Sequence, residues 1–465
     1  MGALEDIRFV EEMALELSAD CGSDSGAGSG SEPEPESNKE IEEAVKVLLQ
    51  GLGEDHEREG IKRTPFRVAK AFRDGTKGYG QKVKDIVEGA LFPEAGLENT
   101  AGYAGGTGGL VVVRDINLFS FCESCLLPFS IQCHIGYIPA GHRVVGLSKL
   151  SRVADVFAKR LQDPQRLANE ICSALQTSIK PAGVSVVLQC WHIQFPETQK
   201  NNLDPKHPSE FEMQGWVQSS VCSSSGVLEN EGNSFRDDFL SLLKFRGINV
   251  DSGSSLEYWC PSRSLKMSKS GVTQSAMISA VASILQSLGE DPMRQELLGT
   301  PYRYVHWLMN FKKSILEPKL NGLSLRSINS PKRIGGIHSE LNLPFCSQCE
   351  HHLLPFYGVV HVGYYCEKEE EVIERSYIHS IVHFYGCKLQ VQERLTKQIA
   401  ETIYSVVGRG VIVVVEANHI CMISRGIEKI GSSTATIAVM GEFASDRGSK
   451  ALFLDNISKS TASWG

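Results

Sequence analysis

The chain has 465 residues, 42% of them hydrophobic and 22% charged, with a formal net charge of −8. This length accommodates two or three domains with sizeable cores, and the mildly acidic balance argues against a generic nucleic-acid-binding or membrane-surface protein. Thirteen cysteines, with no signal peptide, transit peptide or membrane-length apolar run, predict reduced thiols in a cytoplasmic protein, some of them metal ligands.

The first half of the chain divides into a tail and a series of predicted elements. Residues 1–38 are expected to be a disordered tail, because most of it is rich in Ser, Gly, Glu and Pro. A helical pattern begins at Ile41, and alternating apolar residues predict strands up to Tyr137. Asp163 and Pro164 supply an N-cap and a first-turn proline for a further helix. The apolar face of that helix comprises Leu167, Ile171, Leu175 and Ile179.

The same order of elements is expected in the second half. Helices are predicted from about Phe235, followed by strands and a helix with Leu395, Ile399 and Ile403 on one face. Polar and Gly-containing residues from Ser219 to Asn233 form the expected joint, so the domains are predicted at 39–228 and 229–465. Because strands cluster instead of alternating with helices, each half is predicted to be α+β with a largely antiparallel sheet.

The two halves repeat one another. The segment Cys-Glu-Ser-Cys-Leu-Leu-Pro-Phe from Cys122 matches Cys-Glu-His-His-Leu-Leu-Pro-Phe from Cys349, 227 positions further on. The same spacing of 227 separates His192 from His419. A repeat of this length indicates a duplicated domain, not a solenoid unit.

Three residues of the second half, Cys349, His352 and Cys421, form the sharpest chemical signal. A Cys-x-x-His pair on a turn and a distant cysteine beside a strand end supply three ligands, and catalytic zinc sites keep one position open for water. The alternative is a closed structural site with Cys346 as the fourth ligand. The ligand types favour zinc among the divalent ions.

Several ordered motifs resemble the GTP cyclohydrolase I family, and they cover nearly the whole chain apart from the tail and the joint. In the second half they are Cys349-Glu350-His351-His352, Gln392-Glu393-Arg394-Leu395, His419-x-Cys421-x-x-x-Arg425-Gly426 and Ser432-Ser433-Thr434-Ala435-Thr436. In the first half they are Thr64-Pro65-x-Arg67-x-x-Lys70 and Gly146-Leu147-Ser148-Lys149-Leu150-Ser151-Arg152. Two such domains in tandem resemble the plant form of the enzyme.

The resemblance implies a fold, a reaction and an assembly. The fold is the tunnelling fold (T-fold), in which antiparallel sheets from several subunits close into barrels, so a homo-oligomer with active sites between neighbouring domains is expected. The reaction is hydrolysis of GTP to 7,8-dihydroneopterin triphosphate and formate, the first step of pterin and tetrahydrofolate biosynthesis.

The resemblance also implies roles for the second-half residues. Zinc held by Cys349, His352 and Cys421 would lower the pKa of a water, and His351 and His419 would act as general acid and base. Glu393 would accept hydrogen bonds from the guanine N–H edge. The remaining predicted substrate-binding residues of this half are Gln392 and Arg425.

Each half lacks what the other keeps. The first half has replaced the second-half residues His351, His352, Cys421, Glu393 and Arg425 by Ser124, Cys125, Gln194, Gln165 and Thr198, respectively. It keeps a set suited to a triphosphate, namely Arg67, Lys70, Ser148, Lys149 and Arg152. The second half has the reverse losses, with His306, Tyr377 and Ser380 in place of Lys70, Lys149 and Arg152.

These complementary losses predict a composite site, with zinc and base recognition from the second half and the triphosphate grip from the first. The alternative for Lys149 and Arg152 is that they lie on a solvent-exposed surface and have no role in binding. Cys122 and Cys125, even with His192, lack a further ligand, so a vestigial motif with packed thiols is favoured over a metal site there.

Three other functions compete with a zinc hydrolase. A catalytically inactive GTP- or pterin-binding regulator is conceivable because each half has lost residues, but the intact His351, His419 and zinc set argues against it. A zinc-dependent nucleic-acid-binding protein is disfavoured by the acidic balance. A pterin-forming relative with the same fold is disfavoured by Gln392, Glu393 and Arg425. Neither nucleic acid nor membrane is an expected partner.

Overall fold

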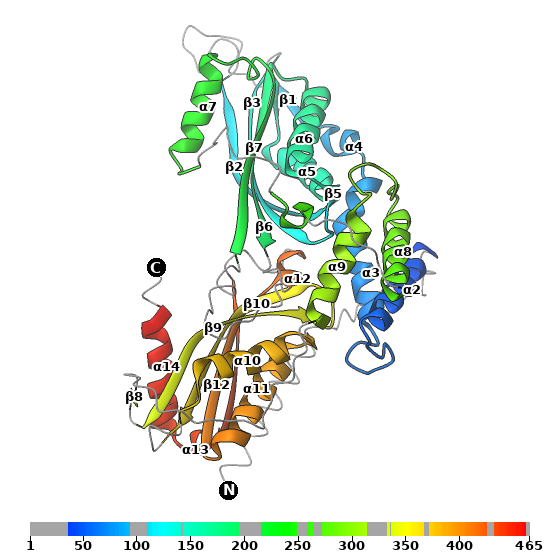
Figure 1. The fold of residues 1–465 in the computed structure, drawn as a ribbon. Helices are drawn as coiled ribbons and strands as arrows, with labels where there is room; N and C mark the ends of the chain where they lie inside the picture. The colour runs from blue at the N-terminus through cyan, green and yellow to red at the C-terminus, as the bar shows by residue number, and fades with distance from the viewer. Residues whose placement is uncertain are drawn as a thin grey trace, which may run out of the picture.

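The computed structural model describes residues 36–93, 109–140, 143–194, 215–248, 259–264, 272–313, 333–334, 336–366, 372–425 and 432–461. Residues 1–35 of the predicted tail lie outside these ranges, while residues 36–38 begin the first described helix. Two curled sheets follow one another along the chain, each with its own helices (Figure 1). None of the described helices is long and apolar enough to cross a membrane.

The first sheet has five strands in the order β5-β2-β3-β6-β7. All neighbours are antiparallel except β5, which pairs in parallel with β2. The strands are β2 (Val111–Cys122), β3 (Pro128–Ile138), β5 (Leu161–Gln162), β6 (Gly183–Gln194) and β7 (Gly215–Gly226). A short pair, β1 (Leu91–Pro93) and β4 (Arg143–Val145), lies outside this sheet.

The helix predicted after Asp163 packs on strands β6 and β7 of the first sheet. The Asp163 side chain accepts a hydrogen bond of 3.0 Å from the Gln165 N–H, and Pro164 occupies the first turn, as predicted. The apolar face of this helix is buried at Leu167, Ile171, Leu175 and Ile179. The helices of this half are α2 (Glu36–Gly51), α3 (Thr64–Thr76), η1 (Lys77–Gly80), α4 (Val83–Val87), α5 (Leu147–Ala158) and α6 (Pro164–Ile179).

The second sheet repeats the first. Its order is β11-β9-β10-β12-β13, with β8 paired to β9, and β11 runs parallel to β9. Its strands are β8 (Arg333–Ile334), β9 (Ile337–Cys349), β10 (Pro355–Tyr365), β11 (Leu389–Gln390), β12 (Gly410–His419) and β13 (Thr434–Gly441). The helices of this half are α8 (Val272–Ser287), α9 (Thr300–Lys313), α10 (Arg375–Gly386), α11 (Gln392–Val407), α12 (Ile420–Ile423), α13 (Glu442–Ser445) and α14 (Arg447–Thr461).

The remaining described helix of appreciable length, α7 (Ser234–Lys244), belongs with the first sheet. Phe239 of α7 lies so close to Gly136 that an added Cβ would meet its ring at 2.6 Å. In the second sheet the same relation holds between Gly363 and Phe453 of α14, at 2.7 Å. Helix α7 is therefore the structural counterpart of α14.

Part of the predicted joint at Ser219–Asn233 belongs to the first sheet. Residues up to Gly226 form strand β7, which pairs with β6 along its whole length. This strand looks like a linker in the sequence because it lies at the edge of its sheet, where partly exposed positions tolerate serine and glutamine. The packing of α7 favours a domain boundary after this helix instead of after residue 228.

Each half has a pair of helices, α2 and α3 in the first half and α8 and α9 in the second, and each pair contacts the metal loop of the other half. The two helix pairs are in this sense exchanged between the halves. Helices α2 and α8 pack together, with Met277 against Gly51, and all four helices α2, α3, α8 and α9 gather beside the junction of the sheets (Figure 1). Thr64 of α3 donates a hydrogen bond of 2.6 Å to the Glu350 carbonyl in the second half. Its counterpart Thr300 of α9 donates to the Glu123 carbonyl in the first half.

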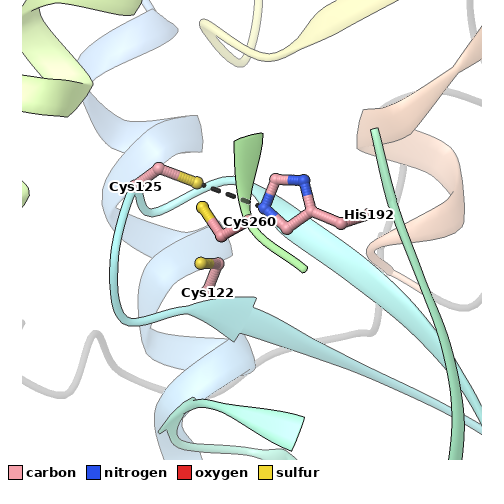
Figure 2. A group of neighbouring side chains, drawn as sticks. All are labelled: Cys122, Cys125, His192 and Cys260. Atoms are coloured by element: carbon pink, nitrogen blue, oxygen red, sulfur yellow. Dashed lines mark hydrogen bonds between the residues drawn. The ribbon is translucent and has the colours of Figure 1, made fainter. Parts of the chain in front are cut away.

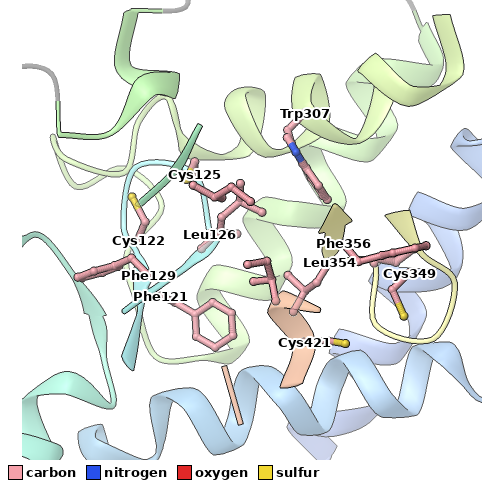
Figure 3. Close-up of a cluster of buried hydrophobic side chains, with 14 of the residues drawn as sticks. Phe121, Cys122, Cys125, Leu126, Phe129, Trp307, Cys349, Leu354, Phe356 and Cys421 are labelled. Atoms are coloured by element: carbon pink, nitrogen blue, oxygen red, sulfur yellow. The ribbon is translucent and has the colours of Figure 1, made fainter. Parts of the chain in front are cut away.

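The exchange joins the two halves through one apolar core. Figure 3 shows the loops after Cys122 and Cys349 on either side of shared apolar side chains, with Trp307 above them. Leu126 and Leu353, at equivalent positions of these loops, both have positive φ, 58° and 51°. The duplicated loops therefore keep the same unusual backbone although their ligands differ.

Candidate active site and a second cysteine cluster

The ligands predicted in the second half come together. Cys349 ends β9, His352 follows in the turn, and Cys421 lies on α12 directly after β12. Their candidate ligand atoms all lie within 4.8 Å of one another, and Cys349 Sγ is 3.8 Å from His352 Nδ1. Cys346 is not part of this group, so the closed alternative with Cys346 as fourth ligand is wrong.

The environment of this group favours a thiolate. A hydrogen bond from the Cys421 thiol holds the pKa of Cys349 well below its usual value, and His352 lowers it further. Burial lowers the pKa of the neighbouring His351; Cys349 opposes this shift, and the positive charge of Arg67 adds to it. Arg67 belongs to the first half, so a residue of that half reaches the metal group of the second within one chain.

His419 is held by contacts on two sides. Its ring stacks on Phe356 with centroids 4.7 Å apart, and Nε2 is 2.8 Å from Gln392 Oε1. The Gln392 amide donates to the Val415 and Thr434 carbonyls at 3.0 and 2.9 Å, which fixes Oε1 toward His419. Because Oε1 can only accept, Nε2 of neutral His419 carries the hydrogen and Nδ1 is the basic nitrogen.

Glu350, between the ligand Cys349 and His351, links both halves. Its side chain is 4% exposed and lies 3.1 Å from Arg58 of the first half and 2.7 Å from Arg394 of the second. The equivalent Glu123 is bridged in the reverse sense, by Arg166 at 2.7 Å and by second-half Arg294 at 3.2 Å. Each metal-loop carboxylate thus takes one cation from its own half and one from the other.

The other predicted substrate residues occupy two places. Glu393 is exposed at the start of α11, Arg425 donates to the Cys421 carbonyl at 2.9 Å, and Lys70 is exposed one turn after Arg67 on α3.

Ser148, Lys149 and Arg152 lie on α5 instead. This helix packs against α4, α6, β2 and η1, all elements of the first half, and Lys149 Nζ donates to the Ile86 carbonyl at 2.7 Å. The described contacts of α5 therefore do not bring this set to the Cys349 group of the same chain.

A second cluster was missed from the sequence. Cys122, Cys125, His192 and Cys260 place their candidate ligand atoms within 4.8 Å of one another, and all four residues are buried (Figure 2). The expectation that a ligand is missing there is wrong, because Cys260 supplies it. Cys260 lies outside the internal repeat, so comparing the two halves could not find it.

Comparison with known proteins decides the family. The sequence profile of GTP cyclohydrolase I matches this chain twice, over residues 41–201 and 277–458. The chain belongs to the GTP cyclohydrolase I family. The paired match agrees with the duplicated sheets and with tandem T-fold domains.

Two relatives resemble the chain along nearly its whole length, and a third resembles less than half of it. GTP cyclohydrolase 1 of Solanum lycopersicum is 58% identical over 465 residues, covering 98% of both chains. GTP cyclohydrolase 1 of Arabidopsis thaliana is 55% identical over 468 residues, covering 99% of this chain and 98% of the relative. GTP cyclohydrolase 1 of Gloeobacter violaceus is 41% identical over 203 residues, 43% of this chain and 82% of the relative. The match along nearly the whole length of the first two relatives is consistent with the same tandem arrangement in them.

Proposed function

We propose that this chain hydrolyses GTP to 7,8-dihydroneopterin triphosphate and formate at the Cys349, His352 and Cys421 group. The observation that carries the proposal is an open three-ligand set with His351 next to it, where Cys349 and His352 influence its pKa. A second histidine, His419, lies two residues before the ligand Cys421. Family membership supports the same reaction.

The donor set fits zinc as the metal. Two cysteine sulfurs and one imidazole nitrogen are soft or borderline ligands, and three protein ligands leave the open position typical of catalytic zinc. When bound, zinc supplies Lewis acidity that lowers the pKa of water to near neutral. The lowered pKa of the buried Cys349 favours its thiolate form, which is the form that binds zinc.

The two histidines move protons. Opening the imidazole ring of guanine requires water to be deprotonated as it attacks C8 and a ring nitrogen to be protonated as the C–N bond breaks. His419 exchanges its proton at Nδ1, since Nε2 is held by Gln392 Oε1. His351, whose lowered pKa keeps it neutral near pH 7, is suited to accept a proton.

Guanine and triphosphate are recognised by different elements. Glu393, exposed at the start of α11, accepts hydrogen bonds from the guanine N–H edge. Gln392 has its amide committed to His419 and two carbonyls, so its role is to position His419. Arg425 and, from the first half, Arg67 and Lys70 supply positive charge beside the metal group.

The Ser148, Lys149 and Arg152 set requires a neighbouring chain. Because the elements that α5 packs against most extensively all belong to the first half, we infer that α5 of another copy meets the metal group and grips the triphosphate. This arrangement makes the active enzyme a homo-oligomer. None of the twelve described cysteines forms a disulfide, in keeping with the cytoplasm as the compartment that we propose.

The inactive regulator considered from the sequence is not supported. It was conceivable because each half has lost residues, but Cys349, His352 and Cys421 come together in the second half. His351 directly precedes the ligand His352, and His419 lies two residues before the ligand Cys421.

The test is turnover by the purified chain. Incubation with GTP should release equimolar formate and a pterin that fluoresces after oxidation. His351→Ala should lose most of this rate, by roughly 10²- to 10⁴-fold, whereas His56→Ala, a histidine paired with Glu57, should retain it. Tight GTP binding without release of formate would mean that the regulator, not the enzyme, is correct.

A further inference from the structure

The second cysteine cluster is built from three separate parts of the chain. Cys122 ends β2, Cys125 lies in the turn that follows, and His192 lies near the end of β6. Cys260 comes from the segment directly before η5 (Pro261–Ser264), outside both stretches matched by the family profile. The four residues are between 0% and 1% exposed, and their side chains converge in Figure 2.

The cluster has the hydrogen bonds of a prepared metal site. His192 Nδ1 lies 2.8 Å from the Ile193 carbonyl, so Nδ1 carries the hydrogen and the Nε2 lone pair faces Cys125 Sγ at 3.3 Å. The Ser124 N–H donates to Cys122 Sγ at 3.3 Å. Metal-ligating histidines usually donate their second ring N–H to such a carbonyl or carboxylate, which fixes the ring for the metal.

The segment that supplies Cys260 is fastened to the first half on both sides of the cysteine. Trp259 packs edge-on against Phe129 and His192, with centroids 5.0 and 5.3 Å apart. Arg263 donates to Ser124 Oγ at 2.9 Å and lies 3.4 Å from Asp163. Cys260 is therefore held in place by contacts that do not depend on a metal.

The equivalent space in the second half is arranged differently. There Phe356 stacks directly on His419 at 4.7 Å, whereas the equivalent Phe129 and His192 are 6.5 Å apart with Trp259 against both rings. In the first half, Trp259 of the 259–264 segment packs beside His192 and covers this histidine. His192 is 1% exposed, whereas the equivalent His419 is partly exposed.

We propose that Cys122, Cys125, His192 and Cys260 bind a structural zinc ion that fastens the segment between the two family domains to the first half. Three cysteines and one histidine complete a tetrahedral set, and structural zinc sites use all four positions for protein ligands. This ion takes no part in GTP hydrolysis. Duplication has thus left one open, catalytic metal group and converted the other into a closed one.

Metal content of the full chain tests the proposal. Protein purified in metal-free buffer with a reductant should contain two zinc ions per chain, as measured by inductively coupled plasma mass spectrometry. Cys260→Ser should retain one, whereas Cys190→Ser, a matched change at a cysteine that is equally buried but outside the cluster, should retain two. Cys421→Ala should also retain one zinc, the one at the Cys122 cluster, because Cys421 belongs to the other metal group.

Cobalt substitution distinguishes the two groups independently. In Cys421→Ala, one Co²⁺ per chain should keep the intense thiolate charge-transfer bands of a tetrahedral three-cysteine site. This measurement and the wild-type zinc content decide the question even if Cys260→Ser does not fold. One zinc per wild-type chain that disappears entirely in Cys421→Ala would overturn the proposal. So would a disulfide among Cys122, Cys125 and Cys260 in protein purified without oxidant.

Discussion

Replacing Arg58 by methionine tests whether the exchanged helices hold the catalytic loop. Arg58 contacts the Glu350 carboxylate at 3.1 Å through both terminal nitrogens, and Glu350 lies in sequence between the ligand Cys349 and His351. Methionine keeps most of the length of the side chain and removes the charge. The change therefore removes the ion pair between the halves, together with the 3.2 Å pair that Arg58 forms with Glu54 in its own half.

The cost in stability follows from the geometry. A hydrogen bond to a charged group contributes about 1.5 to 3 kcal/mol, and Arg58 is 35% exposed, so solvent screening reduces this to about 1 to 2 kcal/mol. Arg394 remains 2.7 Å from Glu350, which keeps the loss below the 3 to 5 kcal/mol of a buried charge left unpaired. The thermal midpoint should fall by about 2 to 8 °C.

The effect on activity should exceed the effect on stability. Glu350 is free to shift toward Arg394 once Arg58 is gone, and the loop that carries Cys349 and His351 shifts with it. Displacements of about 1 Å can cost 10²-fold in rate, so kcat/KM should fall by at least about 10-fold at a temperature where the variant is folded.

Arg294→Met is the matched control. It removes the equivalent cation from Glu123, 3.2 Å away in the loop of the first half, where no catalytic set remains. Its midpoint should fall by a similar amount while kcat/KM stays within about twofold of wild type. Equal losses of activity in both variants, or none in Arg58→Met, would refute the idea that the connection between α2 and α3 positions the catalytic loop.

Three further predictions concern binding, proton transfer and pH. Lys149→Ala and Arg152→Ala should each weaken GTP binding by about 1.5 to 3 kcal/mol, roughly 10- to 150-fold, without affecting guanosine; equal losses for both ligands would contradict a phosphate contact. His419→Ala should lower kcat by roughly 10²- to 10⁴-fold at unchanged zinc content, and loss of metal would instead place His419 among the ligands. Burial lowers the pKa of His361 from 6.5 to about 4, so its neutral form stabilises the fold above pH 6.5 and this stability is lost as pH falls toward 4, by about 2 kcal/mol at pH 5. Thermal midpoints should therefore fall less steeply on acidification in His361→Phe than in wild type, and parallel curves would show that this histidine does not titrate with unfolding.

Local sequence signals predicted much of the secondary structure. Asp163 and Pro164 mark the start of α6 because an N-cap and a first-turn proline act on the backbone next to them. The apolar repeat of Leu395, Ile399 and Ile403 identifies the buried face of α11 in the same way. The polar edge strand β7 misled the same reasoning, because its serines follow from its place at the edge of the sheet and not from a turn.

The candidate active site was predictable to the extent that its residues recur in a known pattern. Cys349 and His352 are three residues apart on one turn, and the resemblance paired them with Cys421 and His419 across the sheet. The role of Gln392 beside His419 was not predictable, because two carbonyl groups from separate strands orient its amide.

By itself, the sequence determined that the chain is a duplicated domain with one intact metal motif and one altered motif, because repeats and turn-sized ligand spacings are local properties. Only the tertiary structure decided which distant residues complete each site. Cys260 joins Cys122 across 138 positions, and Arg58 joins Glu350 across 292. Partners so far apart are selected by the packing of the exchanged helices and of the 259–264 segment, since nothing in the covalent chain between them fixes their distance.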